Sequence, residues 1–229
     1  MKKLIVALAI AAIASAAQAE LLATWTTATA QNINSATVPQ TGGGTYGFSM
    51  VGAGGFNGTS VPAGGTYAVA GATAASAAAA YAGNEYLYFT WNAIYTLELD
   101  SAVGQYTRGA GGAQSAQWGT IIGGVWTDIG TTITGIPTAT PTTSTTPITT
   151  TFTGVTGLES GQLGLAVYGG TGTTATDWFR LDSRPSATPQ VALALNGTMT
   201  DTTPVPEPAT MGLLGLGALA MVLRRKMSK

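Results

Sequence analysis

The chain has 229 residues, only 8% of them charged, and contains no Cys and no His. This composition excludes disulfides, thiolate metal sites and Ser-His or Cys-His catalytic centres, while carboxylate pairs and oxygen-ligated calcium sites stay open. Between residues 20 and 205, nine Asp and Glu stand against three Arg, so this part carries a net charge of about −6 and lacks the basic face that nucleic acid requires.

Residues 1–19 are typical of a secretory signal peptide. Two lysines precede a short apolar run over 4–14, which is too short to cross a hydrocarbon core of ~30 Å as a helix rising ~1.5 Å per residue. Ala17 and Ala19 are the small residues that signal peptidase recognises. We therefore predict an N-terminal signal helix, cleavage ahead of Glu20, and export.

Residues 20–203 are predicted to form one all-β domain. Thr, Val, Tyr, Trp and Phe occur in short runs separated by Gly, Asn and Pro, and apolar and polar residues alternate over 86–91 and 94–100. Two or three more strands are expected within 21–70. Further strands are expected at 117–125, 149–155, 161–168, 178–182 and 190–196. Many short strands with Gly-rich turns predict a β-sandwich or jelly-roll-like domain.

Two segments depart from this pattern. Residues 68–82 are nearly all Ala and are predicted to form a short helix or a loop over the sandwich. Residues 136–151 are rich in Thr and Pro, which breaks strand ladders, so an exposed loop or an edge connection is expected. The alternative for this second segment is a glycosylated or matrix-contacting stretch.

Glu98 and Asp100 form the most notable carboxylate pair. Two residues apart in a strand, they lie on one face. Such a pair can serve as the acid and base of a glycan-active enzyme, or bind calcium together with backbone oxygens. The simpler interpretation is a solvated outer face on an edge strand.

Five tryptophans offer possible platforms for sugar stacking, and most are expected in the core or half-buried. Trp178 differs because alternation places it on one strand face with Arg180 and Asp182. This face is the tentative ligand or calcium site, and Arg180 and Asp182 are expected to form a surface ion pair.

Residues 204–229 contain three features in order. The first is a proline-bracketed motif, held extended by its two prolines: Pro206, Glu207 and Pro208. The second is an apolar run over 209–223, predicted to be a transmembrane helix. The third is a basic cluster that stays cytoplasmic: Arg224, Arg225 and Lys226. A plain membrane anchor would explain the second and third features but not the first.

This order of features resembles the PEP-CTERM sorting signal. The resemblance implies recognition of the tripeptide by an exosortase, a membrane cysteine transpeptidase, and removal of the tail. It also implies a protein of the cell surface, biofilm or extracellular matrix in bacteria that make exopolysaccharide. Residues 163–170, 177–182 and 193–198 resemble the closing strands of jelly-roll domains found with this signal, which are similar in fold to carbohydrate-binding modules.

These observations favour an exported, non-catalytic surface or matrix protein without catalytic residues. One alternative is a carbohydrate-binding module for exopolysaccharide, and another is a carboxylate-dependent glycan-active enzyme. The expected partners are signal peptidase, exosortase, the membrane before processing, and an exopolysaccharide or surface glycan, with no nucleic acid. No cofactor is expected, although a structural calcium ion is possible by analogy with the fold.

Overall fold

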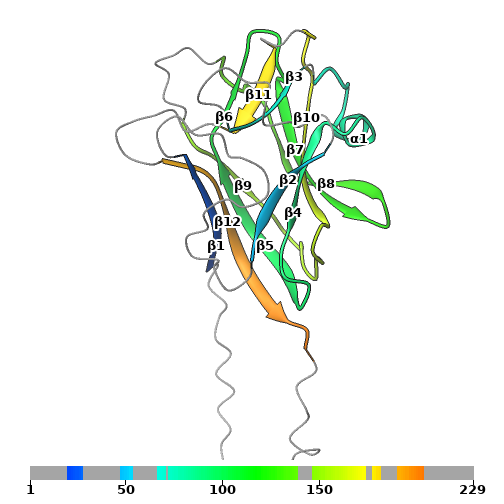
Figure 1. Cartoon of the computed structure of the whole chain (residues 1–229), viewed down its shortest axis with the longest axis vertical. Helices are drawn as coiled ribbons and strands as arrows, with labels where there is room; N and C mark the ends of the chain where they lie inside the picture. The colour runs from blue at the N-terminus through cyan, green and yellow to red at the C-terminus, as the bar shows by residue number, and fades with distance from the viewer. Residues whose placement is uncertain are drawn as a thin grey trace, which may run out of the picture.

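Figure 1 shows the fold in a computed structural model of the chain. The structure describes residues 20–27, 47–53, 66–70, 72–138, 146–173, 177–181 and 190–203. Strands and their turns make up nearly all of these residues, so the all-β prediction is confirmed. Within the described ranges, no helix has the length and apolarity needed to cross a membrane. The helices predicted over 1–19 and 209–223 lie outside those ranges.

A four-stranded antiparallel sheet has the order β1-β12-β5-β9. Its strands are β1 (Glu20–Thr27), β12 (Gln190–Asp201), β5 (Tyr95–Gly104) and β9 (Ile148–Thr151). The first and last strands of the chain are therefore neighbours, with Glu20 opposite Gly197. Consequently the start of β1 and the end of β12 lie at the same end of the molecule (Figure 1).

A five-stranded antiparallel sheet has the order β2-β4-β10-β7-β8. Its strands are β2 (Ser49–Gly52), β4 (Tyr86–Thr90), β10 (Leu163–Tyr168), β7 (Ser115–Ile122) and β8 (Val125–Ile133). A two-residue turn joins β7 to β8, and both of its residues, Gly123 and Gly124, have positive φ angles of 59° and 78°. Glycine adopts this tight hairpin geometry without strain.

A smaller sheet has the order β3-β11-β6, with β3 (Thr66–Ala70), β11 (Trp178–Leu181) and β6 (Tyr106–Arg108). Only Gln105 separates β5 from β6, so the chain passes directly from the four-stranded sheet into the small sheet. Figure 1 shows it at the end of the molecule opposite to the start of β1.

Alternating apolar residues from both large sheets meet in one core. Leu97 and Leu99 of β5 are buried with Leu87 and Phe89 of β4. The rings of Trp25 in β1 and Phe89 touch edge to face, with centroids 5.5 Å apart. Such ring pairs add to the free energy gained by burying apolar area, by about 0.5–1.5 kcal/mol each. The two sheets thus pack through their inner faces, as in a β-sandwich.

Two expectations need correction, and a third agrees with the structure. The Ala-rich segment 68–82 contains the end of strand β3 as well as helix α1 (Ala77–Ala82), because pairing with β11 overrides its weak helical pattern. The segment 136–151 ends in strand β9 at the edge of the four-stranded sheet, which is consistent with the edge connection expected there. β5 is not the edge strand expected for Glu98, because Thr198 of β12 lies on one side of it and Leu97 forms a β-bridge with Leu158 on the other.

Candidate functional site

The carboxylate pair lies on the outer face of the four-stranded sheet. Glu98 is exposed and Asp100 is half-buried, while Leu97 and Leu99 on either side of Glu98 face the core. Thr198 of the neighbouring strand lies opposite Glu98. The burial pattern of β5 is thus consistent with the prediction that the two acids share one strand face. That face is the solvated outer face of the sheet.

A group of three or more Asp or Glu able to hold a metal ion does not occur among the residues that the structure describes. Asp182, which was grouped with the tentative ligand site, lies outside them. The calcium site therefore stays a prediction.

Trp178 is half-buried on the central strand of the small sheet. The guanidinium of Arg180 lies over its ring, 4.1 Å from the ring centroid, and so takes up one ring face. Arg180 is itself buried, and its Nε donates a hydrogen bond of 3.1 Å to Oγ1 of Thr107. The expected surface position of Arg180 is therefore wrong, because this residue is only 2% exposed, while its expected partner Asp182 lies outside the described residues.

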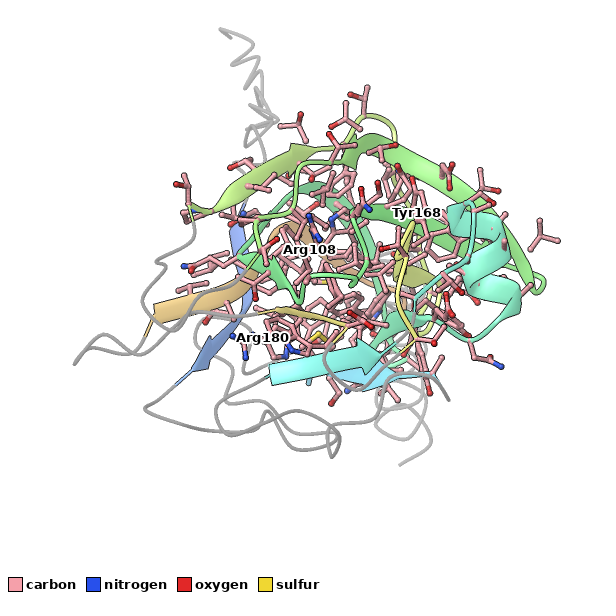
Figure 2. The ribbon with its side chains drawn as sticks, turned by 90° about the horizontal axis from the view of Figure 1, so that it is seen from above. Arg108, Tyr168 and Arg180 are labelled. Atoms are coloured by element: carbon pink, nitrogen blue, oxygen red, sulfur yellow. The ribbon has the colours of Figure 1, made fainter. Side chains whose placement is uncertain are left out.

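Arg108 holds the loops beside the small sheet. Its Nε donates to the carbonyl of Ile136 (2.9 Å) and its Nη1 donates to the carbonyl of Ala110 (2.8 Å). In the same loop, the backbone N–H of Gly111 donates to the carboxylate of Asp177 (2.9 Å). Figure 2 shows Arg108 and Arg180 away from the side that carries α1. These contacts join loops to strands and are structural.

An aromatic cluster missed by the sequence analysis covers the outer face of the five-stranded sheet. It is called the tyrosine surface below, and its members are Tyr81, Tyr86, Tyr88, Trp126 and Tyr168. The four tyrosines are half-buried, and Trp126 is 9% exposed. Figure 2 shows Tyr168 on the side of the molecule that carries α1. The alternation in β4 could have indicated Tyr86 and Tyr88, and Tyr81 is close to them in the sequence, but Trp126 and Tyr168 come from distant parts of the chain.

The end of β12 leads directly toward the proline-bracketed motif. The N–H and the hydroxyl of Thr202 both donate to the carbonyl of Ile94, at 2.7 and 2.8 Å. The next residue, Thr203, donates from its N–H and its hydroxyl to the carboxylate of Asp201. These bonds lower the pKa of Asp201 by favouring the charged form. The described chain is thus fastened to the sandwich up to the residue before position 204.

Residues 204–226 match the family model of the PEP-CTERM protein-sorting motif. The chain carries a PEP-CTERM sorting signal. The matched range includes the tripeptide Pro206, Glu207 and Pro208 and the basic cluster Arg224, Arg225 and Lys226. These residues, like Ala17 and Ala19 of the predicted signal peptide, lie outside the described ranges. The PEP-CTERM match indicates an exported protein that an exosortase sorts to the cell surface.

The PEP-CTERM match covers the tail, and the comparisons assign no family to the β-domain that precedes it. Searches of curated proteins and of solved structures gave no match to the chain. The role of the sorted domain must therefore be argued from its own residues.

Proposed function

We propose that this protein is a non-catalytic component of the cell surface or extracellular matrix, associated with exopolysaccharide and released from its membrane tail by an exosortase. The PEP-CTERM motif carries this proposal, because it follows the last strand of an all-β domain without an intervening segment. At most about 11 Å of extended chain joins Thr203 to Pro206, by the reach of three residues.

Before processing, the apolar run 209–223 would hold the chain in the membrane and the basic cluster would keep its end cytoplasmic. This arrangement would present Glu207, between two prolines, at the outer boundary of the bilayer. Signal peptidase would release the other end after Ala19. Both steps account for an exported domain that is anchored only transiently.

A non-catalytic role is supported by the chemistry that is missing from the chain. Without His or Cys, an enzyme would depend on its carboxylates, and a glycosidase needs two of them facing each other about 5–10 Å apart. Glu98 is instead exposed to solvent on the outer face of the four-stranded sheet. The alternative of a glycan-active enzyme is therefore the weaker one.

We further infer a jelly-roll topology for the sandwich. The chain passes from β4 in the five-stranded sheet to β5 in the four-stranded sheet, and later from β8 back to β9. Crossings of this kind between antiparallel sheets are typical of Greek-key and jelly-roll domains.

The sorting proposal is tested by deleting residues 206–208 in cells that contain an exosortase. We expect the wild-type protein in the surface or extracellular fraction without Lys229, and the deletion variant in the membrane fraction with its tail intact. Cell fractionation and mass spectrometry of C-terminal peptides measure both outcomes. The variant Glu98→Gln is the matched control and should reach the same destination as the wild type. A wild-type protein that keeps Lys229 and a destination unaffected by the deletion would overturn the proposal.

A further inference from the structure

The tyrosine surface has a rigid floor made by Trp126. Its indole lies across Gly119 of β7 and Gly164 of β10, where any Cβ atom would collide with the ring. The indole Nε1 donates a hydrogen bond of 2.6 Å to the carboxylate of Asp128. Two glycines therefore make room for the ring and one acid fixes its orientation, so the floor is formed before any ligand arrives.

Tyrosine rings surround this floor on the side of β4. Tyr81 and Tyr86 have ring centroids 5.7 and 6.3 Å from that of Trp126. Tyr81 and Tyr86 are 4.9 Å apart, and Tyr88 extends the series 6.1 Å beyond Tyr86. Burial, together with the neighbouring hydroxyls of Tyr81 and Tyr88, raises the pKa of Tyr86. The rings of Tyr81, Tyr86 and Tyr88 thus form a continuous series beside Trp126.

Helix α1 is fixed over one side of the cluster. Ser76 caps its N-terminus by accepting from the N–H of Ala79, and Ala77 and Ala80 are buried against the sheet. The hydroxyl of Tyr81 donates to the carbonyl of Gly124 in the β7–β8 turn, at 3.2 Å. These contacts place Tyr81 firmly and leave Tyr88 at the border of the cluster, with only Tyr86 as its ring neighbour among the described contacts.

We propose that the tyrosine surface binds a neutral polysaccharide, and this inference rests on the proposed surface function. The electron-rich face of an aromatic ring attracts the weakly positive C–H groups on one side of a pyranose. Tyrosine hydroxyls and the carboxylate of Asp128 can pair with sugar hydroxyls around the rings. A half-exposed aromatic surface bordered by such polar groups is the usual composition of a ligand site.

Charge decides against an acidic polysaccharide. The acid of this face that contacts the cluster is Asp128, whose carboxylate accepts from the indole of Trp126. The two arginines that the structure describes, Arg108 and Arg180, belong to the small sheet. Arg108 donates to the carbonyl of Ile136, and Arg180 donates to the hydroxyl of Thr107. An anionic polymer would bring negative charge toward this carboxylate, with no cation among the described residues of the face to offset it, and this juxtaposition is unfavourable.

Affinity electrophoresis of the processed protein, recovered from the cells that export it, tests the inference. The gels contain dextran, galactomannan or a mixed-linkage β-glucan as neutral probes and alginate as the anionic probe. We expect slower migration in at least one neutral gel and unchanged migration in alginate. Tyr88→Ala should weaken binding about tenfold, as truncation of an exposed aromatic contact to a ligand commonly does. Tyr88→Trp should preserve binding, because it keeps an aromatic face.

The matched control is Thr198→Ala, which removes an outward side chain from the opposite sheet and should leave migration unchanged. Near-ultraviolet circular dichroism checks that Tyr88→Ala keeps its tertiary packing, and Tyr86→Ala provides a second variant. No retardation in any neutral gel, retardation by alginate alone, or equal retardation of wild type and both alanine variants would overturn the inference. So would a dimer that Tyr88→Ala dissociates in the absence of glycan.

This outcome is separable from that of the sorting proposal. Tyr88→Ala should still lose its tail and reach the same cell fraction as the wild type. If deletion of residues 206–208 leaves sorting unchanged while the neutral gels still retard the protein, the sorting proposal fails and the binding site stands. If sorting behaves as expected and no neutral gel retards the protein, the reverse holds.

Discussion

The outer faces of the two large sheets differ in chemistry, although their inner faces share one core. The outward positions described in β5, β9 and β12 are mostly Thr, Ser, Asn, Asp and Glu, and none is aromatic. One contact on this face is the hydrogen bond of 3.2 Å from the side-chain amide of Asn196 to the hydroxyl of Ser101. On the five-stranded sheet, five aromatic side chains gather instead around two glycines.

Strand formation explains the shared core but not this difference. Threonine on an exposed strand face suits the sheet because it is β-branched and remains solvated. On the outer face of the five-stranded sheet, Trp126 needs the space left by Gly119 and Gly164, and α1 packs beside it. A solvated sheet face needs neither of these features. The aromatic face is therefore the one that calls for a role beyond folding.

Trp126→Ala should give the largest effect. It removes the ring that Tyr81, Tyr86 and α1 pack against, so the free energy of unfolding should fall by about 3 kcal/mol. Urea denaturation of the processed protein measures the loss. Thr198→Ala on the other face should change stability by less than about 0.5 kcal/mol. Equal losses for the two variants would remove the contrast between the faces.

Gly119→Ala should give the next largest effect. The new methyl group would collide with the indole of Trp126, and shifting the ring should cost about 1–3 kcal/mol. The double variant with Trp126→Ala should show almost no further cost from the alanine, because the ring is gone. Denaturation of the two single variants and the double variant gives the coupling, and strict additivity would contradict the glycine floor.

Glu85→Gln tests the acid beside the tyrosine surface. Burial raises the pKa of Glu85, outweighing a hydrogen bond from the backbone of Ala74. A raised folded-state pKa means that the charged form is disfavoured by folding, so the glutamine variant should be modestly more stable at neutral pH. The advantage should shrink as pH falls through the raised pKa and end below the ordinary pKa of glutamate.

Thermal melts across pH 3 to 8 measure the advantage of Glu85→Gln. Asp201→Asn provides a contrast of opposite sign, because the pKa of Asp201 is lowered. That variant should lose stability relative to wild type at neutral pH, and the difference should fade as pH drops through the lowered pKa. An advantage of Glu85→Gln that persists unchanged at acid pH would contradict the assignment.

Glu98→Gln should have the smallest effect. The side chain is exposed on the polar face, so stability should change by less than about 0.5 kcal/mol and binding to neutral polysaccharide should be unaffected. Denaturation and affinity electrophoresis check both expectations. Release of reducing sugar from a polysaccharide by the wild type, lost in Glu98→Gln, would instead revive the glycan-active enzyme.

Local alternation was enough to predict the strands around Leu87 and Leu97 and the shared face of Glu98 and Asp100. Their pattern has period two, and that signal needs no knowledge of partner strands. The predicted strand over 117–125 was wrong at its end, because the chain turns at Gly123 and Gly124. Two consecutive glycines are a signal for a hairpin turn, but the predicted strand extended across them.

The tyrosine surface could be predicted only in part. Alternation separates Tyr86 and Tyr88 from the buried Leu87 and Phe89, but nothing local brings Trp126 to them. That contact depends on the strand order β4-β10-β7-β8, which is set by pairing between distant segments. From the sequence, Trp178 was the predicted sugar platform. In the structure, Arg180 covers one face of its ring.

The position of β12 matters for a chain that crosses the membrane starting from its N-terminus. This strand fills the gap between β1 and β5, yet it is the last part of the domain to emerge from the export channel. Until it arrives, two strands lack their shared neighbour and expose unpaired backbone groups to envelope proteases. Chains that stop before Gln190 should therefore be short-lived in a pulse-chase experiment. Because the sorting tripeptide follows Asp201 within five residues, every chain that carries it also contains the strand that completes the sheet.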